Sequence, residues 1–233
     1  MERLDKLISS QTGYSRKEVK DLVKQKRIKV NNQISIKSDV KVDPEVDEIT
    51  LDNEKIEVKK YVYLMLNKPK GYISATEDNT QPTVLDLIPT KYLHRNLFPA
   101  GRLDKDTTGL MLITDDGDFA HNILSPKKHI TKTYNVTIDI PMKKEMIKGF
   151  EEGVQLIDGE CKPSKLEITG EYTGIVTLTE GRYHQIKRMF GCYQAKVIEL
   201  ERIAMGNLKL PNDLKQGESR EFTQEELLSI QGK

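Results

Sequence analysis

The sequence is poor in cysteine, with only Cys161 and Cys192 among 233 residues, and it has no tryptophan. Two isolated thiols exclude a disulfide-rich scaffold and a cysteine-based metal site, so we expect ordinary thiols in a reducing compartment. Long apolar runs are also lacking, because none approaches the roughly 20 residues that a membrane-spanning helix needs. The N-terminal segment MERLDKLISS is charged and has no apolar signal-peptide core. We therefore expect a cytoplasmic protein without a membrane partner.

Neither sign of charge dominates the whole chain, since 37 Lys and Arg residues against 36 Asp and Glu residues leave a net charge of +1. The first thirty residues are different, because basic residues there outnumber acids by nine to four. Such a local excess is typical of a surface that contacts nucleic-acid phosphates, although a lysine-rich helix face can also be simply solvated. The candidate phosphate contacts in this segment are Arg3, Arg16, Lys17, Lys20 and Arg27.

Local signals divide the chain into two parts. The pattern predicts a short amphipathic helix over residues 3–10 and a second helix that begins at Ser15, where Glu18 completes a capping box. Short strands are expected at residues 28–30, 34–36, 49–51 and 56–58. We expect a first domain over residues 1–58, a linker at residues 59–60 and a second domain over residues 61–233.

The second part is organised around the stretch PAGRLDKDTTGLMLITDD. Its apolar run, Leu110 to Ile113, predicts a short buried strand, and the polar residues Asp106 to Gly109 predict the turn before it. Asp104 then lies at the mouth of a core element, and Leu103 is expected to anchor its loop. Because Arg102 precedes it by two residues, the carboxylate should stay ionised and could act as a nucleophile or base. On the loop alone, a turn-forming role for Asp104 is favoured.

Two further stretches combine apolar periodicity with aromatic or basic residues. In KTYNVTI, alternation predicts a strand with Tyr134 on its apolar face, where the ring could be an ordinary core aromatic. In LTEGRYHQIKRMFGCYQ, the pattern predicts a helix over residues 183–190. Adjacent Lys187 and Arg188 point about 100° apart on such a helix, so only one of them can face a given site. A second basic cluster, close in sequence to the strand that follows Asp104, comprises Lys127, Lys128, His129 and Lys132.

Taken together, these motifs resemble the RsuA family of pseudouridine synthases. The resemblance rests on GRLD followed by TTGL and a strand, and on LNKPKGYIS, LITDDGDFAHNILSP, KTY, LTEGRYHQIKRMFGCYQ and VIELERIAMGNLKL. Residues 1–58, through RLDKLI, SRKEVKDLVKQKRIKVN and VDPEVDEI, resemble the alpha-L RNA-binding module first described in a small-subunit ribosomal protein. The resemblance implies an α+β fold. A small alpha-L RNA-binding domain would precede a catalytic domain whose mixed, mostly antiparallel sheet is flanked by helices.

The resemblance also implies an activity: isomerisation of a flipped-out uridine to pseudouridine in 16S ribosomal RNA, at uridine 516. Asp104 would attack the anomeric carbon of the ribose or act as a base at the ribose, and Tyr134 would stack on the target base. A basic residue after the HQ pair forms a salt bridge with the catalytic aspartate in this family. We assign that role to Lys187, with Arg188 as the alternative, and expect structural hydrogen bonds from His184.

The remaining roles implied by the resemblance concern RNA contacts and the pocket. Arg102 would fill the space left by the flipped base or hold a phosphate, and Lys68 would contact a phosphate or support the site. Lys132 is a further RNA contact, and the pocket would be lined by Leu103, Thr108 and Leu200.

The expected partner is 16S ribosomal RNA or a small-subunit assembly intermediate. No metal or organic cofactor is expected, and a monomer is the default. The alternatives are a 23S synthase of the same family and a non-catalytic RNA-binding assembly factor.

Overall fold

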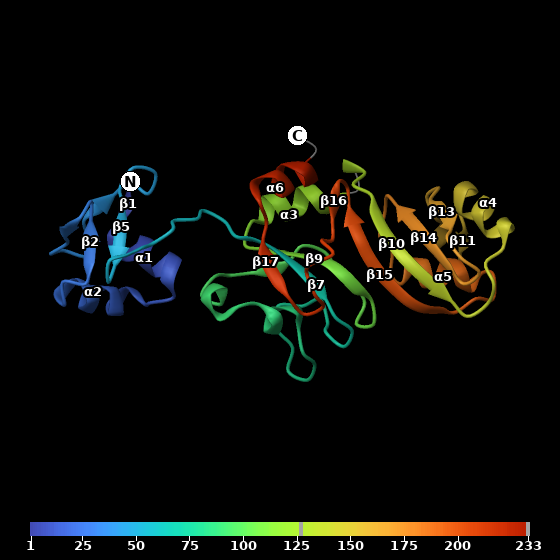
Figure 1. Ribbon diagram of the computed structural model, residues 1–233, viewed down its shortest axis with the longest axis horizontal. Coiled ribbons are helices and arrows are strands. Elements are labelled where there is room, and N and C mark those ends of the chain that lie inside the picture. The colour runs from blue at the N-terminus through green and yellow to red at the C-terminus, as the bar shows by residue number, and fades with distance from the viewer. Residues whose placement is uncertain (126–127, 232–233) are drawn as a thin grey trace. The chain divides into compact units, whose positions relative to one another are not determined.

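The structure is a computed structural model that describes residues 1–125 and 128–231, so Lys127 of the predicted basic cluster lies outside the described residues. Contacts divide the chain into two compact units (Figure 1). Unit 1 comprises Met1–Val62 with Ile88–Leu97, and unit 2 comprises Tyr63–Leu87 with Phe98–Lys233. Within the described residues, no helix has both the length and the apolar character needed to cross a membrane.

Unit 1 packs two helices, α1 (Leu4–Thr12) and α2 (Arg16–Lys24), on one apolar core with short strands. The predicted capping box is confirmed, because the Glu18 amide donates to the Ser15 hydroxyl and the Ser15 amide donates to the Glu18 carboxylate. Unit 1 also contains the 3-10 helix η2 (Thr90–Tyr92). Its strands are β1 (Glu2–Arg3), β2 (Ile28–Val30), β3 (Gln33–Ile34), β4 (Lys41–Val42), β5 (Ile49–Leu51) and β6 (Glu54–Lys55).

Two tight hairpins connect the strands of the β3-β2-β5-β6 sheet. Their turn residues, Asn31-Asn32 and Asp52-Asn53, have φ values of 51°, 63°, 54° and 68°. This left-handed backbone suits Asn and Asp and matches the twist of paired strands. The predicted strand over residues 34–36 is too long, since pairing ends at Ile34 and the Ile36 side chain is 81% exposed.

Unit 2 is built on a nine-stranded sheet with the order β13-β14-β10-β15-β9-β7-β17, in which β16 pairs with β15 and β8 with β9. Among the described strand pairs of this sheet, β15 with β9 is parallel and the others are antiparallel, so the predicted α+β class with a mixed, mostly antiparallel sheet is confirmed. The strands are β7 (Tyr63–Lys68), β8 (Phe98–Pro99), β9 (Thr108–Thr114), β10 (Lys132–Ile138), β13 (Lys165–Ile168), β14 (Thr173–Leu178), β15 (Val197–Met205), β16 (Leu208–Lys209) and β17 (Ser219–Glu221). A separate hairpin consists of β11 (Gln155–Leu156) and β12 (Gly159–Glu160).

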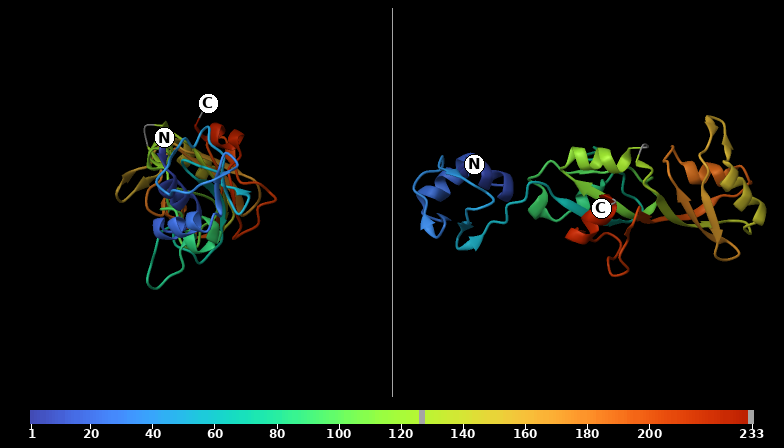
Figure 2. Two further views of the ribbon diagram at one scale, coloured as in Figure 1. Left: turned by 90° about the vertical axis from the view of Figure 1, so that its left-hand side faces the viewer. Right: turned by 90° about the horizontal axis from the view of Figure 1, so that it is seen from above.

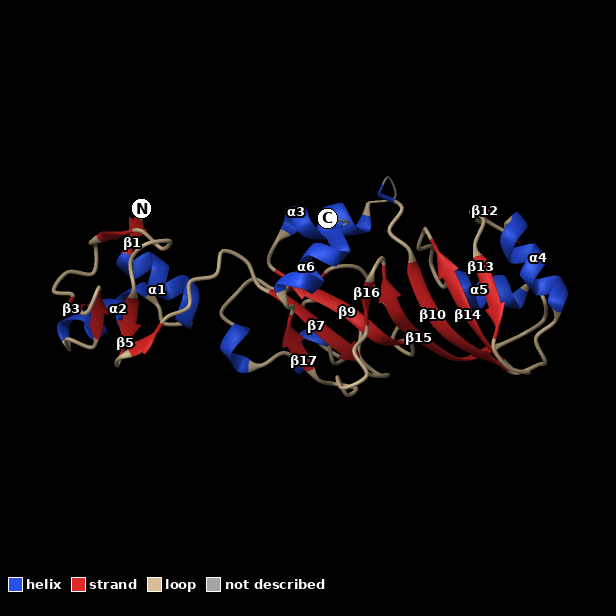
Figure 3. Cartoon of the chain, turned by 45° about the horizontal axis from the view of Figure 1, so that its top comes forward, coloured by secondary structure: helices blue, strands red, loops and turns tan. Residues whose placement is uncertain are grey.

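Helices cover two regions of this sheet (Figure 3). α3 (Gly117–Leu124) and α6 (Gln224–Gln231) share a core with β7 and β9. α4 (Lys144–Glu152) and α5 (Gln185–Gly191) share another with β10, β13 and β14, and these yellow to orange segments gather at one end of unit 2 in the view from above in Figure 2. Unit 2 also contains the short 3-10 helix η1 (Val84–Leu87).

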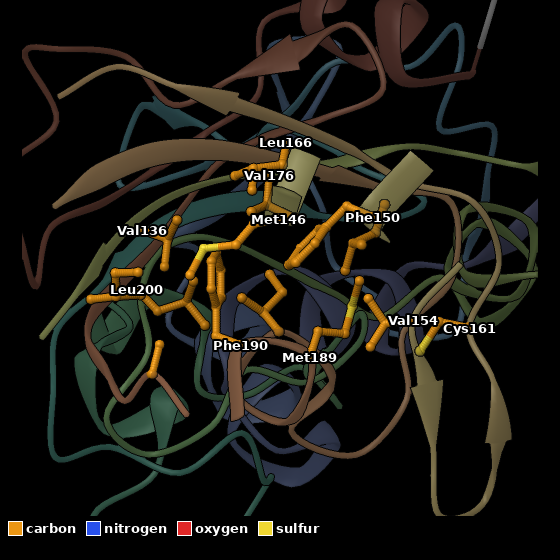
Figure 4. Packing of buried hydrophobic residues seen from close by; sticks show 14 of the residues in the cluster. Val136, Met146, Phe150, Val154, Cys161, Leu166, Val176, Met189, Phe190 and Leu200 are labelled. Carbon is orange, nitrogen blue, oxygen red and sulfur yellow. The ribbon is translucent and has the colours of Figure 1, made fainter. Parts of the chain in front are cut away.

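The core beneath α5 determines where that helix presents its polar side chains. Met189 and Phe190 point into a cluster that also contains Phe150 of α4, and the Phe150 and Phe190 ring centroids lie 5.0 Å apart (Figure 4). Because Ile186, Met189 and Phe190 hold one side of the helix in the core, Lys187 is left on another side. The rotation of α5 is therefore set by packing.

Candidate active site

The central strand β9 places Asp104 in the loop immediately before it. Every residue of β9 is buried. The strand begins at Thr108, so the last two residues of the predicted turn, Thr108 and Gly109, belong to the strand instead. Leu103 is buried as expected. Its amide donates to the Ser74 hydroxyl at 2.9 Å and its carbonyl accepts from the same hydroxyl at 2.8 Å. The residue before Asp104 is thus fixed by both packing and hydrogen bonds.

Lys68 fixes the other side of this loop. Its side chain is fully buried, and its ammonium nitrogen donates to the carbonyls of Asp104 at 3.1 Å, Lys105 at 3.2 Å and Thr107 at 2.8 Å, as well as to Pro69 at 3.1 Å. Burial lowers the pKa of Lys68 to about 8. A phosphate contact by Lys68 is therefore wrong, because its donors are enclosed and directed at backbone carbonyls. The geometry favours the other predicted role, support of the site.

Lys187 supplies the nearest cation to Asp104. Its Nζ lies 3.2 Å from Asp104 Oδ2 and 2.6 Å from Asp106 Oδ1. Burial alone lowers the pKa of Lys187, but the bonds to Asp106 and Asp104 outweigh burial and raise it overall. Burial, the largest single effect, raises the pKa of Asp106, but the bond and the charge of Lys187, with smaller contributions from a backbone hydrogen bond and His184, together lower it. Lys187 thus places one ammonium group against both carboxylates at the start of the site.

The structure separates the two candidate partners of Asp104 on α5. Lys187 contacts Asp104, whereas Arg188 pairs with Asp158 of the β11–β12 hairpin and donates to the Tyr183 carbonyl at 3.2 Å. Arg188 therefore does not pair with Asp104 in this structure, because the rotation of α5 directs its side chain toward Asp158. His184 does contact the site, with Nε2 3.4 Å from Asp104 Oδ1.

The expected pairing of Asp104 with Arg102 is wrong in this structure. Arg102 is exposed, and among the described residues the ion-pair partners of Asp104 are Lys187 and His184. Sequence proximity suggested Arg102, but the intervening Leu103 turns into the core and separates the two side chains. Arg102 consequently remains accessible for a contact outside the protein.

Tyr134 lies on β10, which is separated from β9 by β15 in the sheet. It is partly buried against the core of α4 and α5, which also contains Leu200, and Arg202 of β15 is its cross-strand partner. The same β15 residue pairs with Gly109 of β9. Gly109 has a φ of 97°, and a β-carbon there would lie 2.3 Å from the Arg202 carbonyl oxygen. Only glycine therefore permits this close approach, which brings the strand of Tyr134 near the end of the Asp104 loop.

Other predicted pocket and RNA-contact residues lie along these strands. Thr108 and Leu200 are buried, and the Thr108 hydroxyl lies 3.4 Å from the Leu200 carbonyl. Lys132 begins β10 and is half-buried, and burial, with the charge of Arg202, lowers its pKa. The Arg202 guanidinium is buried and donates through Nε to the Leu110 carbonyl at 2.7 Å, while its Nη2 has no partner in the described part of the chain. Arg202 and Ser74 were not among the residues predicted for the site.

The predicted basic residues of unit 1 fall into two groups. Arg3 and Arg16 both pair with the buried Asp5, at 2.9 and 3.2 Å, and Arg27 pairs with Asp52. Hydrogen bonds, first from Arg3 and then from Arg16, outweigh burial and lower the pKa of Asp5 to about 2. The second group, Lys17 and Lys20, is exposed on α2 without an ion pair in the described structure.

The arrangement can perform covalent or acid–base chemistry at a single carboxylate. Asp104 is partly accessible, with 28% of its side chain exposed, and is fixed through its own carbonyl and a paired cation. Within the described residues, no cluster of three or more His, Cys, Asp or Glu side chains could hold a metal ion.

Comparisons with known proteins show which family the chain resembles. The RNA pseudouridylate synthase family model matches residues 62–191, and the S4 domain model matches residues 2–47. The chain is 44% identical over 232 residues to the uncharacterized RNA pseudouridine synthase YtzG of Bacillus subtilis, covering 97% of this chain and 96% of that protein. It is 40% identical over 230 residues to ribosomal small subunit pseudouridine synthase A of Escherichia coli, covering 98% and 99%. A crystal structure of a pseudouridylate synthase matches with a TM-score of 0.70 and 38% identity, covering 99% of this chain and all of the other.

Proposed function

Because the chain belongs to the RsuA family of RNA pseudouridine synthases and carries an S4 domain, we propose that its target is a uridine of 16S ribosomal RNA, uridine 516 by resemblance. The protein is an RNA pseudouridine synthase, an isomerase. Two features support the finer target: the overall similarity to small-subunit synthases over nearly their whole length, and the matching S4 domain. The substrate is 16S RNA itself or a small-subunit assembly intermediate in the cytoplasm.

The proposed chemistry is centred on Asp104. The bond between uracil N1 and ribose C1′ breaks, and a bond between uracil C5 and the same C1′ forms, so the proton on C5 is lost and N1 gains one. Asp104 either attacks C1′, giving a covalent ribosyl intermediate, or removes a proton from the ribose. The observation that carries this role is the contact of Lys187 with the fixed Asp104 carboxylate, 3.2 Å from Nζ to Oδ2.

We assign binding of the target nucleotide to groups around that carboxylate. A uridine within a helix must be flipped out of its stack, which costs a few kcal/mol. Stacking of the flipped uracil on the Tyr134 ring offsets part of that cost, at about 1–3 kcal/mol per base. The exposed Arg102 guanidinium is available to fill the vacated space or to bind a phosphate. Leu103, Thr108 and Leu200 are the proposed pocket residues.

We further propose that residues 1–58 form the RNA-binding domain and residues 61–233 the catalytic domain. In the former, Lys17 and Lys20 are the strongest candidate phosphate contacts because their charges are exposed and unpaired in the described structure. Replacing both by glutamine in the full chain should weaken RNA binding and reduce the slope of log K against log salt by about 0.7–0.9 for each lysine–phosphate interaction removed. An unchanged slope would count against this assignment.

The target is tested with 16S and 23S transcripts and with the corresponding subunit particles. We expect pseudouridine, mapped chemically, at one position of the 16S RNA only, and loss of that modification in cells lacking the gene. Persistence of the 16S modification in those cells, or product only in 23S RNA, contradicts the proposed target.

The role of Asp104 is tested with Asp104→Asn, which keeps the shape of the side chain but cannot ionise. This variant should bind RNA with an affinity similar to that of the wild type and form no pseudouridine. Measurable product from the purified variant would refute the nucleophile or base role. Lys105→Gln is a suitable control, because this exposed neighbour contacts Gln81 and not the carboxylate.

A further inference from the structure

An exposed pair of rings adjoins the site carboxylate. The Tyr183 and His184 rings are stacked, with centroids 3.9 Å apart and planes inclined by 16°. His184 Nε2 lies 3.4 Å from Asp104 Oδ1, so one end of this pair meets the reacting centre. Tyr183 at the other end is 77% exposed. Since His184 covers one face of the tyrosine ring, the exposed area includes the opposite face.

The backbone produces this stack by an unusual conformation. His184 has φ and ψ of 46° and 36°, in the left-handed region that non-glycine residues rarely adopt. Consecutive side chains point to opposite faces of a strand and about 100° apart on a helix, so neither regular structure would stack two adjacent rings. The left-handed residue before α5 turns the chain so that the rings of Tyr183 and His184 face each other.

Two arginines fix the segment that carries the rings. Arg188 bridges the Tyr183 carbonyl and the Asp158 carboxylate. Arg182, on the other side of Tyr183, donates to the carbonyls of Asp158 at 2.8 Å and Gly159 at 2.9 Å. The exposed ring is thus carried by a backbone segment that is hydrogen-bonded to the β11–β12 hairpin. Because this segment is already ordered, binding of a ligand to the ring would cost little backbone entropy.

We propose that the outer face of Tyr183 stacks on the base of the nucleotide next to the target uridine. This inference rests on the proposed function, because it requires RNA bound at Asp104. The His184 and Tyr183 rings form a stack that begins at the Asp104 carboxylate and continues outward. With the target ribose at Asp104, the outer ring lies where the adjacent nucleotide of the RNA strand would be. Every nucleobase presents a π-face, so the contact binds an unstacked neighbour without selecting its identity.

The contact explains why a tyrosine remains largely exposed beside the active site. Recognition of RNA at loops and distorted sites depends on splayed bases stacked on aromatic side chains. A platform for the neighbouring base would hold the RNA open beside the flipped uridine. It therefore contributes to binding of RNA, while bond breaking at C1′ depends on Asp104.

The test uses a synthetic hairpin of 16S RNA that spans uridine 516. Each nucleotide beside the target is replaced in turn by 2-aminopurine, whose fluorescence falls when it stacks, or by an abasic residue. With the wild-type protein, we expect quenching at one of the two positions and a KM raised by about 5- to 150-fold when that base is removed, which is the range for one stacked base. Tyr183→Ala should raise KM similarly with kcat within about twofold, and abasic replacement should then add little.

Two variants are matched controls for the stack. Tyr183→Phe keeps the ring and should behave as the wild type. Tyr172→Ala removes a tyrosine that is 42% exposed in the turn between β13 and β14, and should leave both KM and quenching unchanged. Because Tyr183 is exposed, Tyr183→Ala should also retain the thermal unfolding midpoint of the wild type.

The outcomes separate the two proposals. Equal quenching and equal KM in the wild type and Tyr183→Ala overturn the stack, as does an abasic penalty that persists in full in the variant. Quenching that depends on Tyr183 without any pseudouridine formed by the wild type supports the stack and contradicts uridine 516 as the target.

Discussion

Replacing Lys68 with methionine tests whether a buried cation positions the catalytic loop. Methionine has a similar length and no donors, so the variant leaves the carbonyls of Asp104, Lys105 and Thr107 without the ammonium. The Thr107 contact is fully buried and the others are partly buried. An unsatisfied buried carbonyl costs about 1–3 kcal/mol, whereas carbonyls that water can reach cost less.

The same substitution removes an unfavourable effect, because burying an ammonium requires its desolvation. That desolvation is the cause of the lowered pKa of Lys68, about 8. The two effects oppose each other, so we expect a net destabilisation of only about 2 kcal/mol. The catalytic loss should be larger, since a displacement of about 1 Å at a reacting group reduces rates by about 100-fold.

The assay compares unfolding in urea with the kinetics of pseudouridine formation. Lys68→Met should lower kcat about 100-fold while RNA affinity changes little, because the lysine is enclosed and does not reach RNA. Lys70→Met is the matched control: it removes a lysine two residues away whose exposed pair with Glu199 contributes at most about 1 kcal/mol. A kcat within threefold of the wild type, in a variant destabilised as expected, would refute the positioning role.

Three further perturbations follow from the contacts described above. Lys187→Met should reduce kcat/KM by about 100-fold or more, because Asp104 then has no lysine partner. Arg188→Met should affect chiefly thermal stability. Equal kinetic losses in the two variants would contradict the different roles assigned to these residues. Asp5 has a folded pKa of about 2 against an ordinary value of 3.8, so the stability it contributes is present above pH 4 and is lost as the pH falls toward 2. Urea unfolding should therefore show the wild type losing its advantage over Asp5→Asn across that range, and a constant difference would oppose this reasoning. Gly109→Ala should destabilise the protein by at least about 2 kcal/mol and abolish activity, since the methyl group meets backbone; a thermal midpoint equal to that of the wild type would contradict it.

Local signals predicted the elements whose causes are themselves local. The Ser15 capping box is confirmed. Thr223 and Glu226 form the same reciprocal pair before α6, since the backbone amide of each donates to the side chain of the other. The apolar run beginning at Leu110 predicted a buried strand, and β9 is buried along its whole length. Such features depend on a few neighbouring residues and require no knowledge of the fold.

The contacts of the candidate site depend instead on distant segments. From the sequence, Lys68 was expected to contact a phosphate or to support the site, and the acceptors that favour support include carbonyls 36 to 39 positions further along the chain. Arg102 was expected beside Asp104 because it is near in sequence, whereas the cation found there is Lys187 on a helix whose rotation the core determines. The resemblance led to Lys187, and residue patterns alone left Lys187 and Arg188 as alternatives.

The parallel pairing of β9 with β15 has a consequence for the order in which the enzyme folds and becomes active. This pairing joins Gly109 to Arg202, two residues that are far apart in the sequence of the catalytic unit. Such non-local pairings form slowly during folding. The loop that carries Asp104 can form its local turn early in folding. Its contacts with β15 form only when β9 and β15 pair, which is a late step. Chains released from denaturant should consequently recover helical signal before they recover turnover.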